Sequence, residues 1–98
     1  MTQPPEVTDN TEGSRFEIHA GGAVAVLTYR RRPGRLVLVH TAVPDELGGR
    51  GLAGLLAQAA VAKAAADGLT IVPLCPFARS WLERHPEATT HVTIDWPA

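Results

Sequence analysis

The sequence contains a single cysteine among its 98 residues, few aromatic side chains and almost no excess charge of either sign. One cysteine cannot form an internal disulfide bond or a four-thiolate zinc site, and four scattered histidines show no metal-ligand spacing. Nine basic side chains against ten acidic ones give a net charge of -1, whereas dedicated nucleic-acid binders are distinctly basic. We therefore expect neither a metal ion nor a nucleic acid as a partner.

Long apolar runs are also absent. No stretch approaches the roughly 20 residues that span a bilayer, and the N-terminal residues lack the basic start and apolar stretch of a signal peptide. These features predict no membrane partner and a cytoplasmic protein, which we expect to be a monomer.

The length fits one domain. Residues 1–13 contain two prolines and three acidic residues but almost nothing apolar to bury, so we expect a disordered tail that folding does not require. The folded domain is then predicted to cover residues 14–98.

The apolar pattern of this domain predicts an α/β fold. Alternating apolar residues and turn signals indicate strands at 16–20, 23–30 and 36–43, the last ending before Pro44. An alanine-rich helix over 52–67 ends at Gly68. A strand at 69–74 and a short helix after Pro76 follow, and residues 91–96 are compatible with a final short strand. This order predicts a mixed, mostly antiparallel sheet with one right-handed parallel crossover and two helices.

A glycine-rich segment, Gly48-Gly49-Arg50-Gly51-Leu52-Ala53, connects the predicted strand to the long helix. The free amides and the dipole of a helix N-terminus favour an anion, and glycine lets the backbone approach a phosphate closely. The segment therefore suggests a diphosphate-binding loop, with a flexible strand-to-helix turn as the alternative. It lacks the Gly-Lys-Ser/Thr of a P-loop and the framing of a dinucleotide fingerprint.

This segment belongs to a longer pattern: His40-Thr41-Ala42-Val43-Pro44 precedes it, and Val72-Pro73-Leu74-Cys75-Pro76-Phe77 and His85-Pro86-Glu87 follow the helix. Together they resemble the small single-domain branch of the GNAT superfamily, the YjdJ-type acetyl-CoA-dependent N-acetyltransferases. The resemblance covers Phe16 to Glu87.

The resemblance implies a minimal GNAT fold that uses acetyl-CoA as cosubstrate and transfers its acetyl group to an unidentified amine. The backbone amides of six residues would bind the CoA diphosphate: Gly48, Gly49, Arg50, Gly51, Leu52 and Ala53. The pantetheine arm would lie between the strands at 36–43 and 69–75. A backbone amide near Ala42 or Val43 would stabilise the developing oxyanion.

The chain departs from the family pattern in three places. Gly48 stands where the superfamily has Gln or Arg, and Arg50 is the nearest cation that could compensate. Gly21-Gly22 joins the first two predicted strands directly, so the two helices that wall the acceptor pocket in larger members are missing. Small relatives often carry a tyrosine, the usual acid, after His-Pro-Glu, but this chain has Ala88.

Two residues are candidates for catalysis. Cys75 precedes a proline and a helix, a setting that favours a thiolate nucleophile and that is suspected of catalysis in similar small members. Its alternative role is that of a small buried hydrophobe. His40, on the strand that would line the cofactor, could act as general base, although a lone histidine on a strand is more often structural.

Four arginines surround a predicted hairpin turn: Arg30, Arg31, Arg32 and Arg35. They suit a solvated turn or, alternatively, a landing site for an acidic partner or a phosphate of CoA. The runner-up function is a non-catalytic acyl-CoA-binding or protein-interaction module on the same fold.

Overall fold

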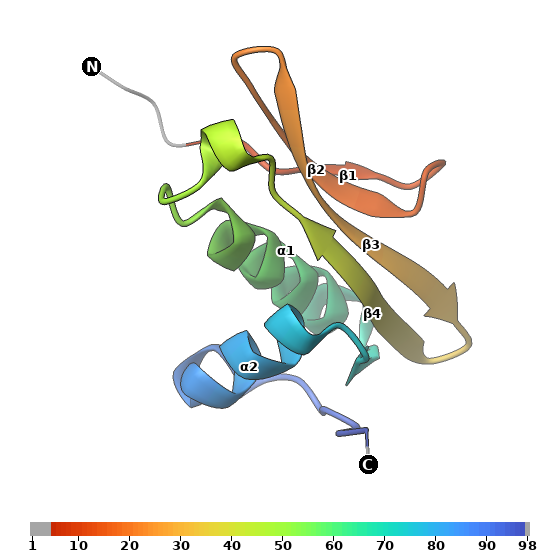
Figure 1. Cartoon of the computed structure of the whole chain (residues 1–98). Helices are drawn as coiled ribbons and strands as arrows, with labels where there is room; N and C mark the ends of the chain where they lie inside the picture. The colour runs from red at the N-terminus through yellow and green to blue at the C-terminus, as the bar shows by residue number, and fades with distance from the viewer. Residues whose placement is uncertain (1–4, 98) are drawn as a thin grey trace.

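A five-stranded sheet runs through the part of the chain that the computed structural model describes, residues 5–97, in the order β1-β2-β3-β4-β5 (Figure 1). The strands are β1 (Thr8–Asn10), β2 (Arg15–Ala20), β3 (Ala23–Arg32), β4 (Arg35–Ala42) and β5 (Thr70–Pro73). The helices are α1 (Leu52–Asp67) and α2 (Pro76–Arg84), with short 3-10 helices η1 (Asp45–Leu47) and η2 (Pro86–Thr89).

Neighbouring strands are antiparallel from β1 to β4, and β4 and β5 are parallel. Tight turns produce the hairpins: Gly21 and Gly22 have φ of +56° and +82°, and Gly34 has φ of +70°. Glycine adopts such angles without steric cost. α1 provides the crossover that a parallel pair needs, and it ends at Gly68, also left-handed. The predicted mixed α/β fold is confirmed.

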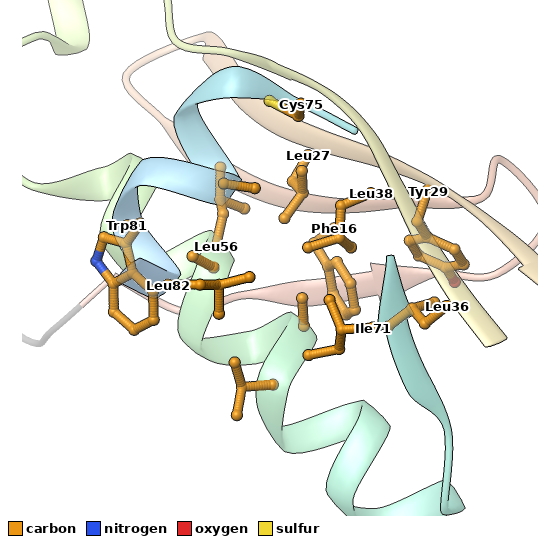
Figure 2. Packing of buried hydrophobic residues seen from close by; sticks show 14 of the residues in the cluster. Phe16, Leu27, Tyr29, Leu36, Leu38, Leu56, Ile71, Cys75, Trp81 and Leu82 are labelled. Atoms are coloured by element: carbon orange, nitrogen blue, oxygen red, sulfur yellow. The ribbon is translucent and has the colours of Figure 1, made fainter. Parts of the chain in front are cut away.

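Both helices lie on one face of the sheet (Figure 1), which we call the inner face. Alternate strand residues point into the core there, because successive side chains of a strand face opposite sides. Figure 2 shows this packing. The buried strand residues are Phe16, Ile18, Ala25, Leu27, Tyr29, Leu36, Leu38 and Ile71. The helices add Leu52, Leu56, Ala57, Ala60, Val61, Ala64, Ala78, Trp81 and Leu82.

The boundary predicted at Ser14 needs a correction. Thr8–Asn10 forms β1, which pairs with β2, and the Asp9 carboxylate binds a buried tyrosine and a half-buried lysine. It accepts hydrogen bonds from the Tyr29 hydroxyl at 2.5 Å and the Lys63 ammonium at 2.6 Å. Backbone pairing with β2 and the contacts of the Asp9 carboxylate therefore hold this segment on the domain. The low apolar content of the segment gave no indication of either. Residues 1–4 of the predicted tail lie outside the described residues.

The predicted final strand at 91–96 is reduced to one parallel bridge between Ile71 and Ile94. The Ile71 N–H donates to the Thr93 carbonyl at 2.9 Å, and the Asp95 N–H donates to the Ile71 carbonyl at 2.8 Å. This contact adds the C-terminal segment to the β5 edge of the sheet.

Candidate functional site

β4 and β5 separate halfway along β4. Their pairing runs from Arg35 opposite Thr70 to Leu38 opposite Pro73, whereas β4 continues to Ala42. At the point of separation the Leu38 carbonyl accepts hydrogen bonds from the N–H groups of Leu74 and Cys75, both at 3.0 Å. We call residues 39–42 the splayed segment, because within the described chain they lie beyond the pairing with β5, while His40 to Ala42 still pair with β3.

Local sequence explains why the chain leaves β5 at this point. Cys75 is extended, with φ of -69° and ψ of 123°, as the residue before a proline tends to be. Pro76 then occupies the first turn of α2, where its missing N–H costs nothing and its fixed φ suits the helix. Cys75 therefore caps α2 beside the splayed segment.

A bulge in β4 decides which side chains of the splayed segment face the core. Tyr29 pairs with Leu38, but the preceding residue, Thr28, pairs with His40, so Val39 is an extra residue in β4. One extra residue exchanges the two faces for everything that follows it. Consequently Thr41, opposite buried Leu27, lies on the inner face, and His40 lies on the opposite, outer face.

The structure brings Cys75 together with Thr41 and not with His40. The Thr41 Oγ1 lies 3.3 Å from the Cys75 Sγ, within hydrogen-bond reach of a sulfur atom. Cys75 is only 3% exposed, whereas the His40 side chain is exposed beside Thr28 on the outer face. Sequence reasoning missed Thr41, because strand alternation gives no sign of the bulge at Val39.

The N-terminus of α1 presents a row of unpaired backbone amides. Within the described part of the chain, none of the N–H groups from Gly49 to Gly54 donates a hydrogen bond, and no side chain caps the helix. The Gly48 N–H is different, because it donates to the Asp45 carbonyl at 3.0 Å in η1. Of the six residues predicted to bind a diphosphate, five therefore carry a free amide.

Backbone angles explain two of the glycines. Gly49 and Gly51 have φ of +77° and +70°, and a Cβ atom on either would meet nothing within 4 Å. Glycine is therefore favoured here for its left-handed conformation and not for lack of room. Gly48, with φ of -62°, has no such requirement.

The first turn of α1 and the Cys75 cap are joined through α2. A Cβ atom at Gly54 would lie 3.1 Å from Trp81 Nε1, so the indole packs against the first turn of α1. Trp81 also stacks on His85, with ring centroids 4.3 Å apart. α2 thus begins directly after Cys75, its N-cap residue, and its buried tryptophan packs against the helix turn that carries the free amides.

Comparison with known proteins now decides the family. A family model described as GCN5-related N-acetyl-transferase matches residues 15–92. The chain belongs to this family. Its fold is also similar to the NMR solution structure of a GCN5-like candidate N-acetyltransferase from Staphylococcus aureus. The two are 29% identical, with a TM-score of 0.71 over 95% of this chain and 90% of that chain. The finer assignment to the YjdJ-type branch stays a prediction.

GCN5-related N-acetyltransferases generally use acetyl-CoA, and the residues present fit such an anionic cosubstrate. Five consecutive free amides of the predicted set and the exposed Arg50, which forms no ion pair among the described residues, suit a diphosphate. Residues 5–97 contain no group of three potential metal ligands. None of their helices combines the length and apolar character needed to cross a membrane.

Proposed function

We propose that this member of the GCN5-related N-acetyltransferase family transfers the acetyl group of acetyl-CoA to an amine. The observation that carries the proposal is the row of free amides at the start of α1, one short 3-10 helix away from the splayed segment. A diphosphate bound by the N–H groups of 49–53 would direct the rest of an extended CoA molecule along β4. Gly48 would contribute its exposed backbone and not its N–H.

The chemistry is proposed to take place at the end of β4. The thioester carbonyl would lie near the backbone amide of Ala42 or Val43, which would stabilise the oxyanion. In one route the Cys75 sulfur attacks the carbonyl carbon, a new S–C bond forms, and the S–C bond to CoA breaks. CoA leaves as a thiolate and takes up the proton that the Cys75 thiol lost. The acceptor amine then attacks the acetyl carbon, so that an N–C bond forms and the S–C bond to Cys75 breaks. The proton that the amine loses restores the thiol.

Thr41 and His40 would have different roles in this scheme. Because Thr41 Oγ1 lies 3.3 Å from the Cys75 sulfur, its hydroxyl can orient the sulfur and donate to it as negative charge develops. His40 lies on the outer face, so it would accept the amine proton in a direct route that bypasses Cys75. His40 as general base remains a prediction.

The alternative function is a non-catalytic acyl-CoA-binding or protein-interaction module. The burial of Cys75, at 3% exposure, favours it, because a buried thiol serves equally well as a small packing residue. Within either function, the monomeric state and the cytoplasmic location remain predictions.

Isotopically labelled acetyl-CoA, followed by mass spectrometry of the intact and digested protein, tests the proposal. We expect label on Cys75 in the wild-type protein and none in Cys75→Ala or Cys75→Ser, with CoA affinity within about twofold of wild type. Thr41→Val should lower the rate of labelling, Thr41→Ser should restore it, and His40→Ala should leave it unchanged.

The outcomes separate the routes. If turnover of an amine survives both cysteine substitutions but fails in His40→Ala, transfer is direct and Cys75 is a packing residue. If the wild-type protein binds CoA but labels neither itself nor any amine tested, the binding module is the correct function.

A further inference from the structure

The outer face of the sheet is not covered by any element that the structure describes, because α1 and α2 both lie on the inner face (Figure 1). Its side chains follow from the alternation along each strand. In β3, both neighbours of Arg30 face inward. Tyr29 is buried in the core, and the Arg31 side chain pairs with Asp67 at the end of α1. Arg30 and Arg32 therefore face outward.

Cross-strand register assembles these side chains into two rows. Arg32 pairs with Arg35, which pairs with Thr70; Arg30 pairs with Val37, which pairs with Val72. Val37 and Val72 are half-buried between inward-facing neighbours. We call Arg30, Arg32, Arg35, Val37 and Val72 the arginine face.

Ion pairs within the described chain do not balance the charges of the arginine face. Arg35 pairs with Asp95 at 2.6 Å, but among the described residues no carboxylate forms an ion pair with Arg30 or Arg32. Arg32 also stands directly opposite Arg35, and like charges in that position destabilise a sheet. By contrast, Arg31 on the inner face has Asp67 as its partner at 3.4 Å.

We propose that the arginine face binds an acidic polypeptide segment of the acceptor, so that the acetylated amine belongs to a peptide or protein with nearby Asp or Glu residues. The inference rests on the proposed acetyl transfer and names its substrate class. Unpaired guanidinium groups bind carboxylates with paired hydrogen bonds. The two valines in the same row as Arg30 offer apolar contact to an extended chain.

The distance along β4 sets where the acidic residues should lie. Arg35, opposite Arg32, is seven positions from Ala42 at the proposed reaction site, which corresponds to about 23 Å in a strand. Val37, opposite Arg30, is five positions from Ala42, or about 17 Å. An extended acceptor lying along β4 would therefore carry its acidic side chains about five to seven residues from the amine.

A nucleic acid is the less suitable occupant. The whole chain has a net charge of -1, and the arginine face contains valines where single-stranded nucleic acids would stack on aromatic rings.

The test measures binding of fluorescein-labelled peptides by anisotropy, with acetyl transfer recorded separately by mass spectrometry. One lysine peptide carries glutamates at five to seven positions from the lysine, and a matched peptide carries glutamines there. We expect the acidic peptide to bind at least tenfold more tightly at low salt, and rising ionic strength to reduce this difference. The double variant Arg30→Glu/Arg32→Glu should remove the preference.

A matched control changes the charge by the same amount elsewhere. Arg79→Glu/Arg84→Glu alters two exposed arginines of α2 and should leave peptide affinity within about twofold. Arg30→Gln/Arg32→Gln, a milder change at the same positions, should also weaken binding and guards against misfolding of the charge-reversed variant.

Equal affinity for both peptides, an equal effect of the α2 variant, or tighter binding of a single-stranded RNA of the same length would overturn the inference. Acetylation of small amines and neutral peptides at the same rate as the acidic peptide would overturn it while leaving the acetyltransferase function intact. Selective binding of the acidic peptide with no acetylation would support the arginine face and contradict the proposed function.

Discussion

Among the residues that the structure describes, Glu17 is the one charged residue that is buried. It lies on the outer face of the sheet and is 7% exposed. Its carboxylate accepts a hydrogen bond from the Asn10 side-chain amide at 3.0 Å. His19 Nε2 lies 3.0 Å from its other oxygen, and the Arg15 guanidinium pairs with it. These partners, Asn10 first, lower the pKa of Glu17 from 4.5 to about 2. The carboxylate thus stays charged in the folded protein.

Because its pKa is lower in the folded state, the Glu17 carboxylate contributes stability that is fully present above pH 4.5 and is lost as the pH falls towards 2. Urea unfolding of wild type and Glu17→Gln at neutral pH, pH 4 and pH 2.5 measures this contribution. We expect wild type to be more stable at neutral pH and the difference to shrink with falling pH. A difference independent of pH would show that the charge of Glu17 is not its source.

At the scale of elements, the loop between β4 and α1 carries the backbone amides that we propose to bind the cosubstrate. η1 uses the N–H of Gly48, whereas the left-handed Gly49 and Gly51 leave the next amides free at the start of α1. In the proposed binding mode no basic side chain is needed at position 48, where a Cβ atom would lie 3.2 Å from the Asp45 carbonyl oxygen. Arg50 supplies the nearby positive charge.

Gly51→Val should weaken CoA binding at least tenfold, or about 1.4 kcal/mol, because a β-branched residue is strained at φ of +70° and would redirect the free amides. Isothermal titration calorimetry measures the affinity. Gly34→Val is the matched control: it has the same φ of +70° and equally open surroundings, but it lies in the β3–β4 hairpin. Equal losses of affinity in both variants would mean that general strain, and not the loop, is responsible.

At the scale of the whole molecule, β1 ties the N-terminal segment to both layers of the fold. Asp9 lies opposite Phe16 and so points inward, where it contacts Tyr29 of β3 and Lys63 of α1. The Lys63 ammonium also lies 5.7 Å from the centroid of the Tyr29 ring. Burial and the contact with Asp9 raise the pKa of the Tyr29 hydroxyl, so it remains a donor.

Two shortened chains, starting at Glu6 and at Ser14, test the contribution of β1. The chain from Ser14 loses Asp9 and leaves the Lys63 and Tyr29 polar groups without their partner, so we expect it to be roughly 1–3 kcal/mol less stable than the chain from Glu6. Urea denaturation of the two chains, with Asp9→Ala in the full chain for comparison, gives the values. Equal stability of the two shortened chains would support the domain boundary predicted from the sequence at Ser14.

The chain's local patterns are sufficient for most of the fold and for the position of the row of free amides. Alternating strands, glycine turns and the alanine-rich helix depend on neighbours in the sequence, so their prediction at 16–20, 23–30 and 52–67 matches β2, β3 and α1 closely. The free amides after Gly48 follow equally directly from a glycine-rich start to a helix. The roles of Cys75 and His40 remain predictions.

Only the tertiary structure decided the features that depend on residues far apart in the chain. The bulge at Val39 arises from β3–β4 pairing, and it brings Thr41, rather than His40, to Cys75, 34 positions away. Strand β1 is held in place by contacts of Asp9 with Tyr29 and Lys63, which lie 20 and 54 positions away in the sequence. The arginine face likewise exists only through cross-strand register. Local composition and periodicity carry no record of these pairings, because each forms only when the sheet and α1 pack together.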